Sequence, residues 1–139
     1  MDITGLIESA LGARKNSYAP YSDYRVGAAL LCDDDTIVCG SNIENASYGA
    51  TVCAERCAVF SAVSTGRTVF KAIAIAGGPS SEEDNLSDLA YPCGICRQVL
   101  REFTVPDKFK VIVARSVSDY KVFTLSELLP ESFGPDNLK

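Results

Sequence analysis

The sequence predicts an α/β fold in which one mixed five-stranded sheet lies between two layers of helices. Apolar residues recur at helical spacing near the N-terminus, and a strand–turn–strand pattern follows around Asp33–Asp35. Two short apolar runs, Phe70–Ala76 and Phe109–Arg115, are typical of buried strands. A helical segment separates these runs. The predicted order α-β-β-α-β-α-β-β-α therefore indicates a three-layer α/β/α sandwich.

The first half of the chain is predicted to hold a helix, a hairpin and a second helix. The first helix is indicated by Ile3, Leu6, Ile7, Ala10, Leu11 and Arg14, and Pro20 ends that helical region. The two strands of the expected hairpin are Tyr24–Cys32 and Thr36–Gly40. A polar loop at Asn42–Gly49 and a second helix at Val52–Ser64 are expected to follow. This assignment places Cys53 and Glu55 in the first turn of the second helix.

The second half alternates strands and helices. After the strand at Phe70–Ala76, the Gly77–Tyr91 loop is rich in Ser, Asp, Glu and Gly, and we expect it to be mobile. The remaining expected elements are a helix from Cys93 to about Phe103, strands at Phe109–Arg115 and Tyr120–Thr124, a short helix at Ser126–Leu129 and a tail at Phe133–Lys139. No role is assigned to the acidic Ser80–Asp88 segment.

Length and composition restrict the class of protein. A chain of 139 residues, 47% of them hydrophobic, is long enough for one core, so residues 1–139 are expected to form a single domain. A net charge of −5 and the lack of any basic run longer than Arg14 and Lys15 argue against a nucleic-acid partner. No apolar stretch approaches the ~20 residues of a membrane span, and no secretory signal is visible. We therefore expect no membrane partner, a cytoplasmic location and reduced cysteines.

Three cysteines and one carboxylate form the most informative pattern. Cys93 and Cys96 have the two-residue spacing with which two thiolates grip one zinc ion, and Cys53 can supply a third sulfur. Both groups lie at predicted helix starts, where free N–H groups and the helix dipole favour thiolates. Three protein ligands leave a position for water, as in catalytic zinc sites, and Glu55 is a proton carrier nearby. The pattern predicts hydrolytic chemistry with one Zn²⁺ per chain.

Other interpretations of these residues stay open at this point. Cys57 stands one helical turn after Cys53, so Cys53, Cys57, Cys93 and Cys96 could form a closed structural zinc site in an interaction module. Cys93 and Cys96 could alternatively be a redox dithiol, which has no use for Cys53 or Glu55.

Other side chains near the ligand groups are also considered. Arg56 and Arg97 lie immediately beside the ligand groups, and either could withdraw charge from the sulfurs or simply lie on a helix surface. Cys32 and Cys39, which flank the hairpin turn, are expected to be buried free thiols.

The chain resembles the zinc-dependent cytidine deaminases. The resemblance is carried by Cys53-Ala54-Glu55 and by Pro92-Cys93-Gly94-Ile95-Cys96-Arg97-Gln98, and it covers nearly the whole chain. Further matching segments are Ala19–Ser22, Arg25–Ala28, Asn42–Tyr48, Glu127–Pro130 and Phe133–Pro135. The chain contains no histidine. It therefore resembles the compact all-cysteine class, which acts on free nucleosides as homotetramers with shared active sites.

The resemblance implies a role for each matching residue. It implies that Cys53, Cys93 and Cys96 bind zinc, that Glu55 shuttles protons while an activated water adds to C4 of cytosine, and that Arg56 neutralises the thiolates, with Gln98 also behind the ligands. The substrate contacts that it implies are Tyr24, Asn42, Glu44, Ala46, Tyr48, Ala54 and Phe133. Tyr24 departs from the family's usual Phe. Tyr48 and Phe133 match positions that reach a neighbouring subunit's site.

The implied reaction is hydrolytic deamination of cytidine and 2′-deoxycytidine to the uridine forms, with release of ammonia, in pyrimidine salvage. Deamination of another aminopyrimidine nucleoside is the nearest alternative. Asn42 and Glu44 together can donate to and accept from hydroxyl groups, which favours an intact ribose. A carboxylate also repels a phosphate, which favours a nucleoside over a nucleotide.

Overall fold

The computed structural model describes residues Met1–Lys139 and has the predicted order of elements. The helices are α1 (Ile3–Arg14), α2 (Ala54–Ser64), α3 (Gly94–Glu102) and α4 (Leu125–Leu128). The strands are β1 (Tyr24–Cys32), β2 (Ile37–Ser41), β3 (Phe70–Pro79), β4 (Lys110–Ser116) and β5 (Asp119–Thr124). Two short 3₁₀ turns, η1 (Tyr48–Ala50) and η2 (Pro135–Asn137), lie in the connecting and C-terminal segments.

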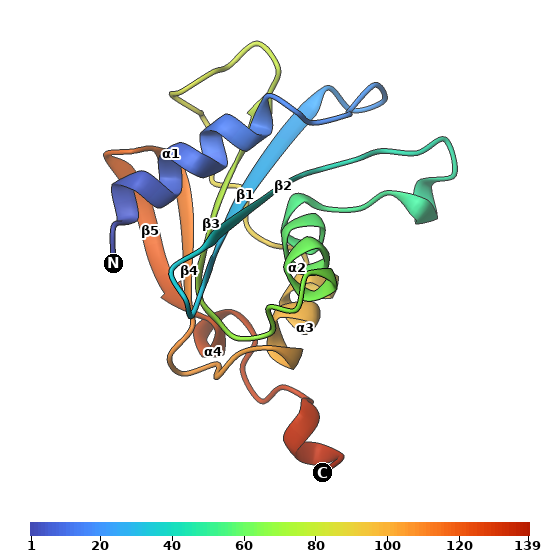
Figure 1. Cartoon of the computed structure of the whole chain (residues 1–139). Coiled ribbons are helices and arrows are strands. Elements are labelled where there is room, and N and C mark those ends of the chain that lie inside the picture. Colours follow the sequence, from blue (N-terminus) through green and yellow to red (C-terminus); the bar gives the residue numbers. More distant parts are fainter.

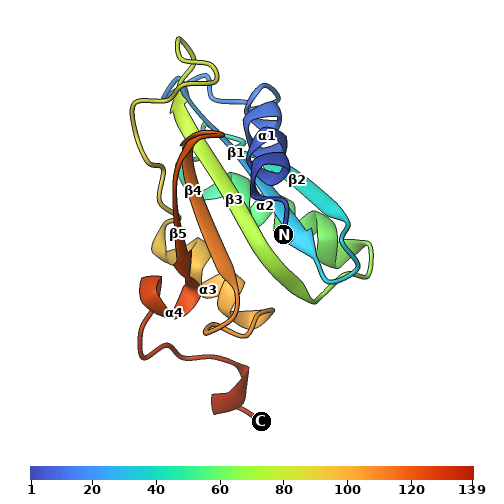
Figure 2. The same cartoon turned by 90° about the vertical axis from the view of Figure 1, so that its left-hand side faces the viewer.

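The five strands form one mixed sheet in the order β2-β1-β3-β4-β5 (Figures 1 and 2). Strands β3 and β4 are parallel, and the other neighbouring pairs are antiparallel. A parallel pair requires a long crossover, which α3 and its flanking loops supply. The predicted mixed sheet and α/β class are confirmed.

Helices cover both faces of the sheet, with α1 on one side and α2 and α3 on the other (Figure 1). The alternation of side chains along β3 produces two different faces. The face toward α1 carries Ala72, Ala74 and Ala76, whereas Ile73 and Ile75 pack in the larger cluster toward α2 and α3. The small alanines let α1 lie close to the sheet.

Two glycines allow helices to approach the strands closely. A Cβ atom on Gly27 would lie 2.0 Å from the Ala10 carbonyl oxygen of α1. A Cβ atom on Gly40 would lie 2.4 Å from the Ala58 nitrogen of α2. Backbone atoms cannot yield to such contacts, so these positions require glycine. Because α2 carries Ala54 and Glu55, Gly40 also determines how close these two residues lie to the sheet.

Some boundaries differ from the prediction. Helix α2 begins at Ala54, because Val52 forms a bridge with Ile43 and Cys53 is the N-cap residue. Strand β3 continues to Pro79, three residues beyond the predicted end, because Tyr24 and its neighbours on β1 pair with it. Cys32 is buried as predicted, but the prediction for Cys39 is wrong: it is exposed on the edge strand β2.

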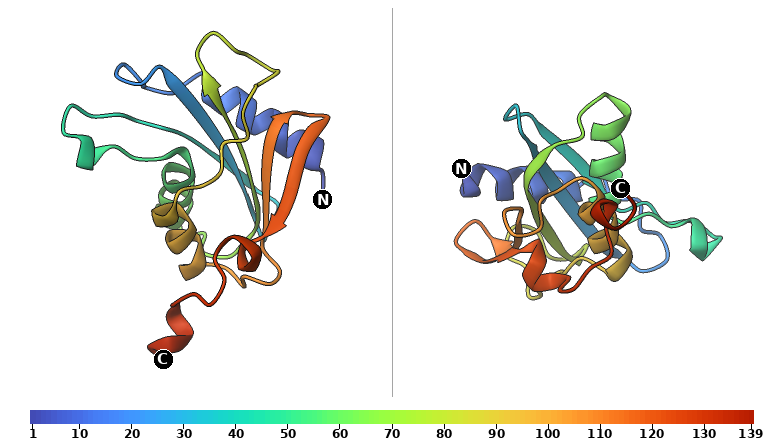
Figure 3. Two further views of the ribbon diagram at one scale, coloured as in Figure 1. Left: turned by 180° about the vertical axis from the view of Figure 1, so that it is seen from behind. Right: turned by 90° about the horizontal axis from the view of Figure 1, so that it is seen from below.

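Two segments project from the body. The β2–α2 connection, which contains η1, extends away from the sheet in Figure 1, and η2 with the C-terminus projects past α3 in Figure 3. Each carries an exposed aromatic residue, Tyr48 at 77% and Phe133 at 58% exposure. No helix combines the length and the apolar content required to cross a membrane.

Candidate zinc centre and active site

Three cysteine sulfurs meet where the N-termini of α2 and α3 come together. Cys53 is the N-cap residue of α2, Cys93 is the N-cap residue of α3, and Cys96 lies in the first turn of α3. Their sulfurs all lie within 4.8 Å of one another, and Cys53 and Cys93 are 3.9 Å apart. A tetrahedral zinc with bonds of about 2.3 Å requires sulfurs about 3.8 Å apart. The three thiols therefore fit one Zn²⁺.

Cys57 does not belong to this cluster. Only the sulfurs of Cys53, Cys93 and Cys96 lie close enough together to share a metal ion. The sulfur of Cys57 lies outside this group, although Cys57 is one helical turn from Cys53. The sulfurs therefore do not form the closed four-thiolate arrangement considered above. Three soft ligands that leave a coordination position open are typical of a catalytic zinc centre.

Positive charge lies beside the ligand group. The pKa of Cys53 is lowered mainly by a hydrogen bond with the Cys96 thiol and, to a smaller extent, by a hydrogen bond from Arg56. Arg56 Nη2 donates to Cys53 Sγ at 3.5 Å, whereas its buried Nε has no partner. The free N–H groups at the two helix N-termini also favour thiolates. These features favour the thiolate form of Cys53, which is the form that binds metal.

Arg97, the other candidate for this role, acts differently. Its Nε donates to the Pro92 carbonyl at 2.7 Å and its Nη1 donates to the Leu128 carbonyl at 2.6 Å. Its guanidinium therefore braces the turn before Cys93 and ties α3 to α4.

Glu55 is a buried carboxyl group next to the cluster. It lies in the first turn of α2 and is 4% exposed. Burial is the main cause that raises its pKa to about 7, and the nearby Cys53 also raises it. A carboxyl group with a pKa near neutrality can both accept and donate a proton, as general acid–base catalysis requires.

A cavity of about 290 Å³ opens onto these groups. Its lining combines the predicted residues Tyr24, Asn42, Cys53, Ala54, Glu55 and Cys93 with Val26, Thr51, Val52, Ile75, Ala90 and Tyr91, which sequence reasoning missed. Most of this lining is apolar, which suits a flat neutral ring. Tyr91 directly precedes the Pro92-Cys93 motif, and this proximity to a metal ligand in the sequence is the signal that could have identified it as a lining residue.

Asn42 and Glu44 are both engaged with backbone groups. Asn42 Oδ1 accepts from Val26 N and Asn42 Nδ2 donates to Tyr24 O, each at 2.8 Å. Glu44 accepts from Tyr21 N at 2.9 Å and from the Ser22 hydroxyl, and these hydrogen bonds lower the pKa of its carboxyl group. Each side chain still has hydrogen-bonding capacity left for a ligand.

The remaining predicted contacts lie outside the cavity of this chain. Glu44 and Tyr48 line a neighbouring open hollow that shares Thr51 with the cavity, and Ala46 is exposed on the same connection. Phe133 is held in the C-terminal segment, where Gln98 Nε2 donates to its carbonyl at 2.9 Å. Gln98 thus contacts the tail and not the sulfurs.

This combination of fold and site defines a zinc-dependent hydrolytic enzyme of the α/β class. A sequence profile described as "Cytidine and deoxycytidylate deaminase zinc-binding region" matches residues 2–113. The chain belongs to the cytidine deaminase family, as its similarity to relatives named cytidine deaminase also shows.

Relatives match along almost the whole chain. A cytidine deaminase of Halalkalibacterium halodurans is 44% identical over 99% of this chain and 98% of its own. One from Sporosarcina psychrophila is 43% identical over 99% and 96%. The crystal structure of cytidine deaminase from Burkholderia pseudomallei superposes with a TM-score of 0.84 at 41% identity, covering 96% of this chain and 100% of that chain.

Proposed function

We propose that this protein converts cytidine and 2′-deoxycytidine to uridine and 2′-deoxyuridine by hydrolysis, with release of ammonia, in pyrimidine salvage. The observation that carries the proposal is a buried Glu55 beside a three-cysteine zinc centre at the end of an apolar cavity. The relatives named cytidine deaminase support this substrate.

Cys53, Cys93 and Cys96 would hold the metal. When bound, zinc supplies a Lewis acid that lowers the pKa of a water toward neutrality. Glu55 would take one proton from the attacking water and deliver it to the ring nitrogen. It would then take the second proton, left on the added hydroxyl group, and deliver it to the departing amine, so that ammonia leaves and the water supplies both protons. Burial raises the pKa of Glu55 to about 7, so the carboxyl group can hold the proton between these transfers.

Backbone groups at the two helix starts are suited to orient the pyrimidine. Ala54 is the first residue of α2, where an N–H group has no intrahelical acceptor and remains free to donate. The Cys93 carbonyl accepts from Arg97 N at 3.0 Å and keeps a second lone pair for the exocyclic amine. The aromatic ring of Tyr24 lines the same cavity and offers a wall for the base.

The lining favours a nucleoside over a nucleotide. Neither the cavity nor the neighbouring hollow contains a lysine or arginine, and Glu44 contributes a carboxylate. A phosphate requires cationic or multiple N–H donors, whereas Asn42 and Glu44 suit ribose hydroxyl groups. Cytidine should therefore be deaminated far faster than deoxycytidylate. Parallel assays of the two substrates test this point, and a preference for the nucleotide would contradict it.

A spectroscopic assay tests the proposal as a whole. The purified protein should lower the ultraviolet absorbance of cytidine, and a zinc chelator should abolish the change. Glu55→Gln should reduce kcat at least about a thousandfold while zinc per chain stays at the parent value. A Glu55→Gln protein that deaminates cytidine at the parent rate would show that the assignment of Glu55 is wrong.

We also propose a single domain over residues 1–139, a homotetramer with shared active sites and a cytoplasmic location. One sheet carries both hydrophobic clusters, which supports the single domain. The exposed Tyr48 and Phe133 support contacts with neighbouring subunits. All six cysteines are free, which supports a reducing compartment. Sedimentation analysis should give about four times the mass of the chain.

A further inference from the structure

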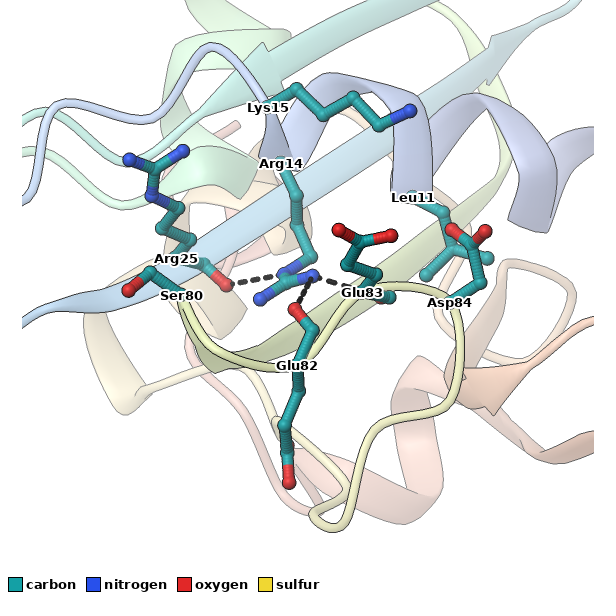
Figure 4. Close-up of a pocket in the computed structure, with 8 residues that line it drawn as sticks. All are labelled: Leu11, Arg14, Lys15, Arg25, Ser80, Glu82, Glu83 and Asp84. Atoms are coloured by element: carbon teal, nitrogen blue, oxygen red, sulfur yellow. Dashed lines mark hydrogen bonds between the residues drawn. The ribbon is translucent and has the colours of Figure 1, made fainter.

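Arg14 is a buried arginine far from the zinc ligands in sequence. It ends α1, is 5% exposed and donates five hydrogen bonds of 2.9–3.1 Å, all to backbone carbonyls. The acceptors are the carbonyl oxygens of Arg25, Gly78, Pro79, Glu82 and Glu83. Figure 4 shows the guanidinium enclosed between the end of α1, strand β1 and the loop after β3. All five N–H groups of the side chain are used.

The five carbonyls belong to the segments that form the wall of the cavity. Arg25 lies on β1 between Tyr24 and Val26, both of which line the cavity. Arg14 ends α1, which covers the face of the sheet opposite α2 and α3 (Figure 1), so it contacts the β1 backbone from the side opposite the cavity. Gly78 is the register partner of Arg25, so the same guanidinium ties the end of β3 to β1.

The loop that Arg14 holds leads directly to the site. After Glu82 and Glu83, the chain is fixed again by buried Leu86, whose N–H donates to the Arg115 carbonyl at 2.9 Å. It then supplies Ala90 and Tyr91 to the cavity before reaching Cys93. A Cβ atom on Gly77 would lie 2.7 Å from Ala90 Cβ, so this wall packs tightly on β3. A loop expected to be mobile is thus held at both ends.

No carboxylate pairs with Arg14; the dipoles of the carbonyl groups compensate its charge. A buried cation with this many backbone partners is costly to replace, because its removal leaves several carbonyls without donors. Lysine cannot substitute fully, since one ammonium group has three donors and lacks the planar fork of arginine.

We propose that Arg14 is a positioning residue for the nucleoside cavity: from the far side of the sheet it holds the β1–β3 end and the Glu82–Tyr91 loop so that Tyr24, Ala90 and Tyr91 form a fixed wall. The inference rests on the proposed deaminase function. It also assigns a role to the acidic Ser80–Asp88 segment, which has no role in the proposed reaction.

Kinetic measurements on Arg14→Ala test the proposal. We expect KM for cytidine to rise about tenfold or more, kcat to stay within about threefold and zinc to remain at one per chain. Methylguanidinium chloride at millimolar concentration should lower KM toward the parent value, because it can occupy the vacated carbonyl cage; sodium chloride at equal ionic strength should not. Arg14→Lys should show an intermediate KM. Lys15→Ala removes the same charge from the neighbouring exposed position and should match the parent.

A second measurement does not depend on turnover. Cleavage by a glutamate-specific protease at Glu82 and Glu83 should be at least several-fold faster in Arg14→Ala than in the parent and Lys15→Ala proteins. If Arg14→Ala does not fold, the KM of Arg14→Lys and its protease sensitivity decide the question in the same way. Parent-like KM and cleavage in a folded Arg14 variant would overturn the proposal, as would a loss of kcat and zinc in parallel. Failure of the parent itself to deaminate cytidine would instead refute the proposed function.

Discussion

At the residue scale, the proposed chemistry depends on the positions of three thiols and one carboxyl group. They belong to two short motifs, Cys53-Ala54-Glu55 and Cys93-Gly94-Ile95-Cys96. Cys53 and Cys93 occupy N-cap positions, and Glu55 follows in a buried first turn, so the candidate metal site and the proposed proton carrier both lie at the starts of helices. The same carboxyl group on a solvated turn would keep an ordinary pKa. Burial raises the pKa of Glu55 and so makes its carboxyl group suitable for the proposed proton transfer.

Cys57 provides a prediction at this scale. Because its sulfur lies outside the ligand cluster, Cys57→Ser should leave zinc content at the parent value and kcat/KM within about twofold. Metal analysis and the cytidine assay measure both quantities. Cys96→Ser is the matched comparison and should lose most of the zinc. Loss of zinc from Cys57→Ser would instead restore the four-thiolate interpretation.

At the scale of elements, the close contact of α2 with β2 sets the position of the site. Gly40→Ala would place a Cβ atom 2.4 Å from a backbone nitrogen of α2 and should destabilise the protein by about 3 kcal/mol. Gly12→Ala, inside α1, meets nothing within 4 Å and should stabilise it by about 0.5–1 kcal/mol. Thermal unfolding at one fixed protein concentration measures both shifts. Equal melting temperatures for the two variants would contradict the packing argument.

Helix α3 carries the metal ligands at its start and the C-terminal tail along its side. Arg101 Nε donates to Ser132 Oγ at 2.9 Å, and its Nη2 contacts Asp136 Oδ1 at 2.7 Å. A Cβ atom on Gly134 would lie 2.3 Å from the guanidinium carbon, so the tail lies directly against it. These contacts hold the segment that contains Phe133.

Arg101→Ala should release this tail. If Phe133 reaches a neighbouring subunit's site as proposed, KM for cytidine should rise several-fold while zinc content stays unchanged. Steady-state kinetics with metal analysis test this, and Glu102→Ala, at the next position on α3, serves as the control. An Arg101→Ala enzyme with parent KM would argue against a substrate role for the tail.

At the scale of the whole molecule, exposed carboxylates outside the site shape the response to acid. The Ser87 side chain lowers the pKa of Glu82, and the Thr124 backbone N–H lowers that of Glu127, each from an ordinary value of 4.5. A pKa that is lower in the folded state adds stability above about pH 4.5, and that stability is lost as the pH falls through the lowered value.

The double variant Glu82→Gln/Glu127→Gln should therefore show a flatter decline of melting temperature between about pH 5 and 3 than the parent protein. Glu8→Gln changes one exposed carboxylate on α1 and serves as the control. An unchanged slope in the double variant would show that these hydrogen bonds do not govern acid stability.

Local patterns determined much of this protein. Helical and alternating periodicity predicted the order of helices and strands, since burial of one face imposes those periods on the sequence. The Cys-x-x-Cys spacing with Cys53 predicted the metal ligands, and Cys53-Ala54-Glu55 the proton carrier. Such features depend on residues near one another in the chain.

Only the tertiary structure decided which distant groups meet. It excluded Cys57 from the sulfurs, turned Arg97 toward backbone carbonyls, and added Ala90 and Tyr91 to the cavity. It also joined Arg14 to carbonyls more than 60 residues away. Apart from Tyr91, which lies close to Cys93 in sequence, spacing along the chain carries no record of these contacts, because sheet order and helix packing bring together segments whose side chains show no shared period.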